Sequence, residues 1–337
     1  MSTPDLLLVR PEGSFGDYAR GDDCACGVAG DRCAEPGRVD SKRKLRTARM
    51  QIPHMAARDA VALALSEDAA AHDVTTRWSV APRQWATAVI VTRQPGLAAG
   101  VPLTAEVYAR IGGETQIDES VPDGTRLEAG DVLARISGPA HQIITGERTV
   151  LNFLQRLCGI ATLTDRYVTA VRDLPVHVLD TRKTAPGLRL LDKYAVTAGG
   201  GSNHRLDLAA MVLLKENHIA AAGGVTTAID SVRKNMASEG RAMAIEVEVA
   251  TIAQVREALQ AQPSWIMLDN MTVPQLAEAV RLRRELVPDS DIRLEASGTI
   301  TLGDLRAVAE TGVDAISVGS LTHSAPAMDL SMLLSIA

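Results

Sequence analysis

The feature that most constrains the fold is a repeated alternation of short apolar runs and helical patterns in the second half of the chain. The apolar runs of strand length lie at residues 176–179, 211–214, 244–249, 265–268, 292–294 and 315–318. Helical patterns separate several of them, at residues 252–259, 273–286 and 302–311. A repeated strand and helix predict a parallel sheet with helical crossovers. We expect an α/β fold built as an open (β/α) barrel, incomplete because fewer than eight units are evident, with an open doubly wound sheet as the alternative.

The first half predicts a smaller companion domain. A helical pattern at 56–67 precedes an apolar stretch at 86–91 that is typical of a buried strand, and turn sequences flank a further extended piece at 132–136. The clearest helix covers 147–171 and bridges the two domains. Alternate residues from 328 to 336 are apolar, which predicts a strand that returns to the small domain's sheet. The expected division is an extension at 1–50, a small domain at 51–146 with the terminal strand at 326–337, and a barrel domain at 147–325.

Residues 1–50 show neither helical nor strand periodicity, so we predict a disordered extension, with Met50 or Met55 as alternative starts of the protein. Three cysteines lie close together in this segment: Cys24, Cys26 and Cys33. No fourth zinc ligand is evident nearby and the spacing is not a standard one, so inert cysteines are favoured over a zinc site. Cys158 lies alone within a helical pattern, which excludes a disulfide framework for a domain of this size.

The overall charge limits the partners that the chain can bind. A formal net charge of −6 gives no general attraction to nucleic acid or to anionic membranes, so anion binding must come from a local cluster. No apolar run approaches the roughly 18–20 residues of a membrane span, and the apolar run at 6–9 is too short for a signal peptide. A cytoplasmic location is therefore expected.

Most apolar runs of the second half end in polar residues, which would meet at one face of a barrel. The cations among them are Arg182, Lys183, His204, Arg205 and Lys215, joined by Arg148 from the bridging helix. Arginine binds carboxylate or phosphate through paired hydrogen bonds and lysine adds a compact charge, so these residues suit a substrate with several negative charges. The carboxylates Glu248 and Asp269 suit Mg²⁺ or ribose hydroxyls.

Each of these residues also has a structural interpretation. An isolated Arg or Lys at a strand end is often a solvated charge or half of a salt bridge, and Glu248 and Asp269 could neutralise the neighbouring cations. Asn217 and His218 could bond the backbone at a strand end. Ordinary turns could form at Ser297-Gly298 and at Gly319-Ser320. However, the loops after the last strands of such barrels often bind phosphate through their backbone amides.

Several stretches carry a resemblance to a known family. The longest are Asp-Thr-Arg-Lys-Thr-Ala-Pro-Gly at 180–187, Gly-Gly-Gly-Ser-Asn-His-Arg at 199–205 and Lys-Glu-Asn-His at 215–218. Shorter motifs lie at 146–152, 246–249, 268–271, 295–298 and 318–322. Together they resemble the quinolinate phosphoribosyltransferase family. The resemblance runs from about Ala56 to the C-terminus and leaves the preceding residues unmatched.

The resemblance implies an α/β sandwich followed by an open barrel. It implies transfer of a phosphoribosyl group from phosphoribosyl pyrophosphate to quinolinate with decarboxylation, which gives nicotinate mononucleotide, and it implies Mg²⁺ as the cofactor. It also implies a homodimer, or a hexamer as the alternative, whose active sites lie between one subunit's barrel and its partner's sandwich domain. Arg148 would reach across that interface.

The resemblance also assigns roles to individual residues. The catalytic residues would be Lys183, Glu248 and Asp269, of which the two carboxylates would face the ribose hydroxyls and Mg²⁺. The substrate's carboxylates and the pyrophosphate would contact Arg148, Thr181, Arg182, Lys183, His204, Arg205 and Lys215. The 5′-phosphate would contact Ser297, Gly298, Thr299, Val318, Gly319 and Ser320. Thr299 departs from the family's motif, in which many relatives carry a second glycine, although a backbone amide remains available there.

Two other functions remain open at this point. A paralogous phosphoribosyltransferase could accept another acidic base such as nicotinate, although the pairs 182–183 and 204–205 favour a dicarboxylate. The second function is that of a non-catalytic binding protein, because the turns at 121–139 resemble those of biotinyl or lipoyl folds. No carrier lysine is present in that segment, however. A metal-binding regulator built on the N-terminal cysteines is less favoured than either.

Overall fold

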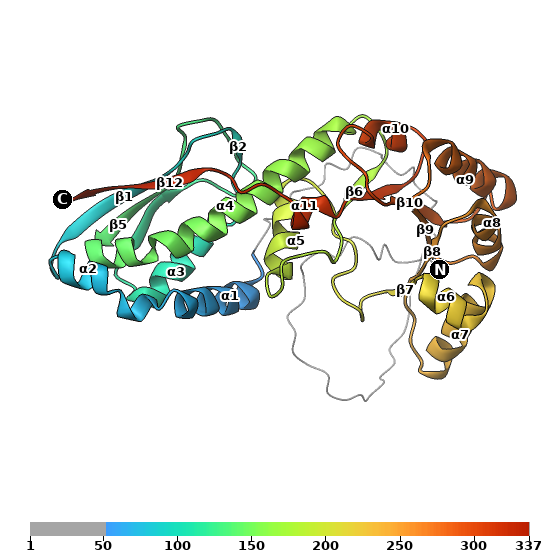
Figure 1. Ribbon diagram of the computed structural model, residues 1–337, viewed down its shortest axis with the longest axis horizontal. Coiled ribbons are helices and arrows are strands. Elements are labelled where there is room, and N and C mark those ends of the chain that lie inside the picture. Colours follow the sequence, from blue (N-terminus) through green and yellow to red (C-terminus); the bar gives the residue numbers. More distant parts are fainter. Residues whose placement is uncertain (1–51, 337) are drawn as a thin grey trace, which may run out of the picture. The chain divides into compact units, whose positions relative to one another are not determined.

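The computed structural model describes residues 52–336 of the protein (Figure 1). The extension predicted at 1–50 and its three cysteines lie outside these residues. Within them the strands form a four-stranded antiparallel sheet, a six-stranded parallel sheet and a two-stranded ribbon of β2 (Gly96–Leu97) and β4 (Arg126–Leu127). The expected α/β class is confirmed, with an antiparallel-sheet part and a parallel-strand part.

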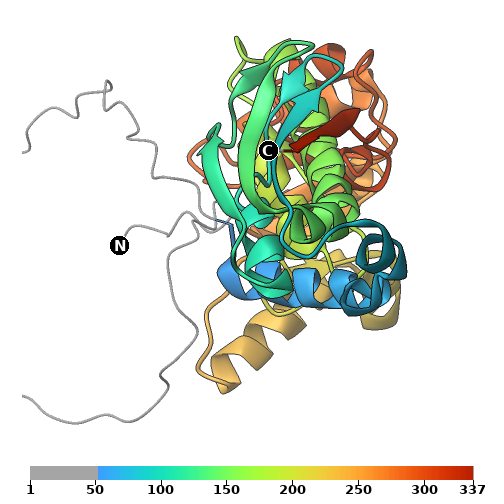
Figure 2. The same cartoon turned by 90° about the vertical axis from the view of Figure 1, so that its left-hand side faces the viewer.

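The antiparallel sheet has the strand order β12-β1-β5-β3. Its strands are β1 (Trp85–Thr92), β3 (Gln116–Ser120), β5 (Val132–Pro139) and β12 (Leu330–Ile336). Along β1, Ala86, Ala88 and Ile90 are buried and alternate with more exposed residues, as expected for a strand covered on one face. Figure 2 shows the red β12 beside the cyan and green strands, and its register pairs Ala88 with Leu334. The C-terminal segment thus completes a sheet that begins far away in the sequence.

Helices pack on this sheet. α1 (His54–Glu67) contacts α3 (Leu103–Ile111), and α4 (Ala140–Ala170) contacts β1, β5 and β12. Two short helices follow α1, namely η1 (Ala70–His72) and α2 (Val74–Ser79). Asp73 caps α2 because its carboxylate accepts the N–H of Thr76 at 2.9 Å. No helix of residues 52–336 has the length and apolar composition that crossing a bilayer requires.

The bridging helix begins earlier than expected. The sequence predicts a start at Glu147, but α4 begins directly after β5, at Ala140, although glycine at position 146 weakens a helix interior. Gly146 is retained in the helix by close packing: a Cβ there would lie 2.5 Å from a ring carbon of Tyr108 and 2.9 Å from Ile111 Cδ1. Tertiary contact with α3 therefore outweighs the local preference against glycine.

The parallel sheet has the order β6-β11-β10-β9-β8-β7. Its strands are β6 (His177–Leu179), β7 (Val212–Leu214), β8 (Ile245–Val249), β9 (Trp265–Asp269), β10 (Arg293–Ser297) and β11 (Ala315–Ser317). The last strand, β11, returns to pair with the first, β6, which is the order of a barrel. β6 and β7, consecutive in the sequence, lie at opposite ends of this order and do not pair, so among the described strands the barrel is open between them.

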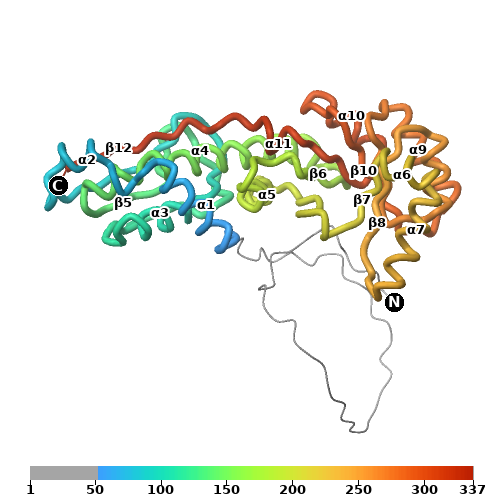
Figure 3. The backbone as a smooth tube through the Cα atoms, turned by 60° about the horizontal axis from the view of Figure 1, so that its bottom comes forward, coloured from blue at the N-terminus to red at the C-terminus, as the bar shows by residue number. Residues whose placement is uncertain are grey.

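The helices of the barrel part match the predicted pattern with one correction. They are α5 (Arg189–Ala198), α6 (Glu216–Ala222), α7 (Val225–Ser238), α8 (Ile252–Ala261), α9 (Val273–Leu286), α10 (Leu305–Ala309) and α11 (Ser320–His323). The helix predicted at 302–311 is only the five residues of α10, because a turn precedes it in which Asp304 N bonds Thr301 O. After α11 the chain runs beside α4 to β12 (Figure 3), where Met328 N donates to Gln155 O at 2.9 Å.

Candidate active site

Most of the predicted site residues lie at or just after the C-terminal ends of the parallel strands (Figure 1). Segment 180–183 follows β6, Lys215 follows β7, and Glu248 is the penultimate residue of β8. Asp269 and Ser297 end β9 and β10, and segment 318–320 follows β11. Because parallel neighbours end at the same edge of a sheet, the fold brings these residues to one side of the barrel.

The loop after β6 contacts the loop after β11. Thr181 Oγ1 accepts the N–H of Lys183 at 3.0 Å, and Thr322 Oγ1 donates to Lys183 O at 2.8 Å. A Cβ on Gly319 would lie only 3.1 Å from Lys183 Cδ. The exposed ammonium-bearing chain of Lys183 therefore lies directly against the segment that was expected to bind phosphate.

An ion pair between Arg156 and the buried Asp192 holds the loop after β6 in place. Arg156 on α4 donates to both carboxylate oxygens of Asp192, at 2.8 and 2.7 Å. Asp192 is fully buried and also accepts the N–H of Ala185 at 3.0 Å, while Arg156 Nη2 reaches Thr322 O at 3.3 Å. Sequence reasoning missed this network, because no local pattern indicates that residues 36 apart meet.

Arg182 and Arg205 lie close enough for their positive charges to interact. Arg182 Nε is buried and has no hydrogen-bond partner among the described residues. Arg205 is 8% exposed, and its Nη1 donates to Met211 O at 3.0 Å. Burial lowers the pKa of Arg205, and the positive charge of Arg182 lowers it further. An anion bound between the two guanidinium groups would supply both the missing partner and the compensating charge.

The expected carboxylates have partners at the rim. Lys215 Nζ lies 2.7 Å from Glu248 Oε2, so this cation and this carboxylate do form the salt bridge that the structural interpretation predicted. Half of the Lys215 side chain remains exposed, so the pair is accessible. Asp269 Oδ2 accepts from Asn270 Nδ2 at 2.9 Å. His218 Nδ1 accepts the N–H of Lys215 at 3.0 Å, which is the backbone role anticipated for it.

The ends of β9 and β10 are joined at a tight approach. Asn270 N donates to Ser297 O at 2.9 Å, and Asn270 adopts a positive φ of 52°. Gly298 has φ 139°, and a Cβ there would lie 2.7 Å from Asn270 Oδ1, so only glycine fits. Thr299 follows it and is exposed. Val318 has a side chain only 1% exposed and an N–H that donates to Leu179 O at 2.9 Å, so neither is open to a ligand.

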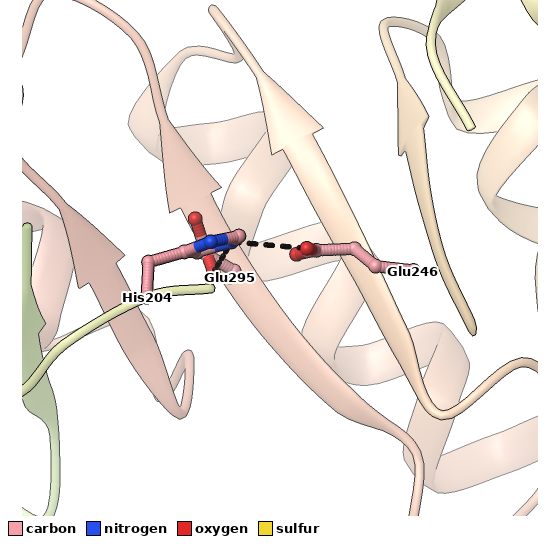
Figure 4. Close-up of side chains that lie close together, drawn as sticks. All are labelled: His204, Glu246 and Glu295. Carbon is pink, nitrogen blue, oxygen red and sulfur yellow. Dashed lines mark hydrogen bonds and ion pairs between the residues drawn. The ribbon is translucent and has the colours of Figure 1, made fainter. Parts of the chain in front are cut away.

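His204 forms hydrogen bonds within the protein through its ring nitrogens. Its Nδ1 accepts the N–H of Arg205 at 2.7 Å and its Nε2 lies 3.0 Å from Glu246 Oε2 (Figure 4). Burial lowers the pKa of His204, which disfavours the imidazolium. Both ring nitrogens have partners within the protein, and the binding of an anionic group by His204 stays a prediction.

Two buried glutamates complete this cluster and were absent from the predicted site. Glu246 on β8 and Glu295 on β10 are fully buried and, with His204, offer ligand atoms within 4.8 Å of one another. Burial raises the pKa of both carboxyl groups. The sequence did contain a signal for Glu246. It lies two residues before Glu248, so both side chains face the same side of β8. A charged residue inside an apolar strand also requires a polar partner.

Arg148 is exposed on α4 and lies apart from the strand-end residues. Eight residues separate it from Arg156, which touches the loop after β6, and this places it roughly 12 Å further along the helix axis. Within a single chain Arg148 therefore lies away from the strand-end residues, and the contact across a subunit interface that was expected of it stays a prediction.

An incomplete barrel whose strand ends gather this many cations defines a class: α/β-barrel proteins that bind small molecules with several negative charges. The comparisons with known proteins narrow that class. Residues 160–333 match the model of the quinolinate phosphoribosyl transferase C-terminal domain, and residues 73–158 match that of the N-terminal domain. The chain belongs to the quinolinate phosphoribosyl transferase family.

Individual relatives support this family assignment. The chain is 41% identical over 288 residues to quinolinate phosphoribosyltransferase (decarboxylating) 1b of Nicotiana tabacum, covering 81% of this chain and 80% of that one. It is 42% identical over 266 residues to a probable nicotinate-nucleotide pyrophosphorylase (carboxylating) of Bacillus subtilis, covering 79% and 89%. The structure of the nicotinate-nucleotide pyrophosphorylase of Francisella tularensis superimposes with a TM-score of 0.79 at 35% identity, covering 85% of this chain and 98% of that one.

Proposed function

We propose that the protein transfers the phosphoribosyl group of phosphoribosyl pyrophosphate to quinolinate and decarboxylates the adduct, giving nicotinate mononucleotide, pyrophosphate and carbon dioxide in NAD biosynthesis. The observation that carries the proposal is the buried, unpartnered Nε of Arg182 beside Arg205, because two guanidinium groups suit the two carboxylates of quinolinate. Relatives named for this reaction cover most of the chain and support it.

The remaining cations would bind the phosphoribosyl donor. We assign Lys183 and Lys215 to the pyrophosphate, and Ser297, Gly298, Thr299, Gly319 and Ser320 to the 5′-phosphate. The contact of Lys183 with Gly319 supports this assignment, because it joins the two phosphate-binding segments. Val318 is left out of this assignment because its side chain lies in the core.

Glu248 and Asp269 would face the ribose and hold Mg²⁺, directly or through water. The donor set fits: partly exposed carboxylate oxygens at adjacent strand ends are what Mg²⁺ uses together with substrate phosphates. When bound, Mg²⁺ neutralises charge on the pyrophosphate as it departs. The two carboxylates stabilise the positive charge that develops at the anomeric carbon when the C–O bond to pyrophosphate breaks.

The pyridine nitrogen then attacks that carbon, with its lone pair forming the new C–N bond. The alkylated nitrogen is cationic, so its charge stabilises the carbanion left at C2 when the 2-carboxylate departs as carbon dioxide, and the electron pair at C2 then takes up a proton. Arg182 and Arg205 contribute by fixing the ring relative to the ribose.

We propose further that the protein works as a homodimer, or as a hexamer built from such dimers, with Arg148 completing the partner subunit's site. Its exposure on α4 supports this, as do large exposed apolar side chains in the same part of the chain, including Trp78 at 79% and Leu333 at 52% exposure. A cytoplasmic location stays a prediction, since one tobacco relative is named as mitochondrial and a rice relative as chloroplastic.

The direct test is to incubate the purified protein with quinolinate, phosphoribosyl pyrophosphate and Mg²⁺, and to measure nicotinate mononucleotide and carbon dioxide. Nicotinate serves as the parallel substrate. Both products from quinolinate, and none from nicotinate, are expected. Turnover of nicotinate instead would overturn the proposed specificity, and no turnover of either would favour a binding protein.

A further inference from the structure

Lys193 and Asp180 form an ion pair in the interior of the protein that has no role in the proposed reaction. Lys193 on α5 is 2% exposed, and Asp180, directly after β6, is fully buried. Lys193 Nζ lies 2.5 Å from Asp180 Oδ1. Removing both charges from water has a large desolvation cost, and apolar side chains of similar volume often give equal or greater stability. Stability alone therefore does not account for the pair.

The ion pair connects two segments that carry substrate-binding cations. Asp180 begins the loop that contains Arg182, and His204 directly precedes Arg205. Asp180 Oδ1 accepts the N–H of His204 at 2.8 Å, and Lys193 Nζ donates to His204 O at 3.0 Å. Both backbone polar groups of the residue before Arg205 are thus bonded to the pair.

The segment before Arg205 is also bonded to β6. Ser202 N donates to Val178 O at 2.9 Å, and Asp180 N donates to Ser202 O at 3.1 Å, so this segment runs parallel to β6. The hydrogen-bond network orients the amide of Asn203 so that its Nδ2 donates to Asp180 Oδ2 at 2.6 Å and to Lys193 O at 3.0 Å. The ion pair is therefore the centre of a network that joins the two segments.

The geometry of this network bears on the spacing of the two guanidinium groups that we assign to quinolinate. Arg182 lies two residues after Asp180, and Arg205 lies one residue after His204. Burial lowers the pKa of Lys193, and the positive charge of Arg182 contributes to the same effect, so Arg182 lies within electrostatic range of the pair. A change at the pair should therefore reach both arginines.

Lys183, which we assign to the pyrophosphate, is held by different contacts. Thr322 Oγ1 donates to Lys183 O at 2.8 Å. Further along the same loop, Ala185 N donates to the carboxylate of Asp192 at 3.0 Å. Loosening the ion pair should therefore disturb the two arginines more than it disturbs Lys183.

We propose that Lys193 is a positioning residue: its ion pair with Asp180 fixes the spacing of the two guanidinium groups so that it matches two adjacent carboxylates on the substrate. The inference rests on the proposed function, which assigns Arg182 and Arg205 to quinolinate. Lys193 is itself buried, so it acts through the arginines and not by contact with the substrate.

The first test is Lys193→Met, which removes the ammonium group and keeps an unbranched chain. KM for quinolinate is expected to rise about 10- to 100-fold, while KM for phosphoribosyl pyrophosphate stays within about threefold of that of the unmodified protein. The variant leaves Asp180 without its cation, so it is also expected to be less stable. Lys234→Met, exposed on α7, is the matched control.

The double variant of Lys193→Met with Asp180→Asn separates position from stability. It leaves no unpaired charge in the interior, so urea unfolding is expected to give a midpoint close to that of the unmodified protein. Because His204 O still lacks its donor from α5, KM for quinolinate is expected to remain raised about 10-fold. A KM that recovers together with stability would show that the pair only holds the fold and would overturn the proposal. Equal rises in both KM values would overturn it as well.

Calorimetric binding gives a readout that does not need turnover. Phthalate has two adjacent carboxylates but no ring nitrogen, so it can bind without reacting, and pyrophosphate with Mg²⁺ is the reference ligand. In both variants Kd for phthalate is expected to rise about 10-fold or more, while Kd for pyrophosphate stays within about threefold. Equal changes for both ligands, no change for either, or no binding of phthalate by the unmodified protein would contradict the proposal. Phthalate binding without turnover of quinolinate in the unmodified protein would defeat the proposed function alone, and the Kd values would still test Lys193.

Discussion

Arg182 shows how one residue connects the architecture to the chemistry. Its place in the segment that follows β6, next to Lys183, is evident from the sequence, but the environment of its Nε is not. That atom is buried without a hydrogen-bond partner among residues 52–336, and the charge of Arg182 contributes, after burial, to lowering the pKa of Arg205. The site is therefore electrostatically incomplete until an anion enters.

Replacing Arg182 by lysine is expected to raise KM for quinolinate about 10- to 100-fold, because lysine keeps the charge but loses the paired hydrogen bonds to a carboxylate. Initial rates at varied quinolinate and at varied phosphoribosyl pyrophosphate check this. Arg166→Lys, exposed on α4, is the control. An unchanged KM for quinolinate would contradict the assignment.

Glu295 makes stability depend on pH. Burial raises the pKa of Glu295 from its ordinary 4.5 to about 8 in the folded state. The unfolded chain loses this proton first, so the stabilisation is complete below pH 4.5 and is lost as pH rises toward 8, by at most about 1.4 kcal/mol per pH unit. Urea unfolding between pH 5 and 8 measures it. Glu295→Gln should flatten the decline relative to the unmodified protein; an identical pH dependence in both would contradict the burial of a protonated acid.

At the scale of elements, α4 shows where local preference and packing disagree. Glycine is a poor helix former, yet the helix continues through Gly146, where α3 packs closely against it. The same helix supplies Arg156 to the loop after β6 and Gln155 to the approach of β12. One long helix thereby organises both sheets.

Gly146→Ala is expected to lower the free energy of unfolding by about 1–3 kcal/mol, because the new methyl group must displace the Tyr108 ring and this outweighs alanine's better helix propensity. Urea unfolding followed by far-UV circular dichroism measures the change. Gly303→Ala, where the nearest atom would be 3.6 Å away, is the control. A more stable Gly146→Ala protein would show that α3 does not restrict this position.

At the scale of the whole molecule, the proposed dimer predicts complementation. Arg148→Ala and Lys215→Ala proteins should each be nearly inactive. After subunit exchange at equal amounts they should recover about a quarter of the activity, because half of the dimers are hybrids with one intact site each. Exchange is verified with differently tagged subunits. No recovery despite exchange would place Arg148 in its own chain's site.

The sequence alone determined the features that depend on local order. The spacing of apolar runs predicted the parallel strands to within a few residues and α9 over its observed range, because strand and helix periods depend on neighbouring positions. The polar residues after each run predicted the edge of the sheet at which the proposed site lies. The tertiary structure decided what depends on residues far apart meeting. It lowered the pKa of His204 by burial, brought Glu246 and Glu295 beside it, and kept Gly146 within α4, because burial and partners, rather than residue type, determine charge and fit.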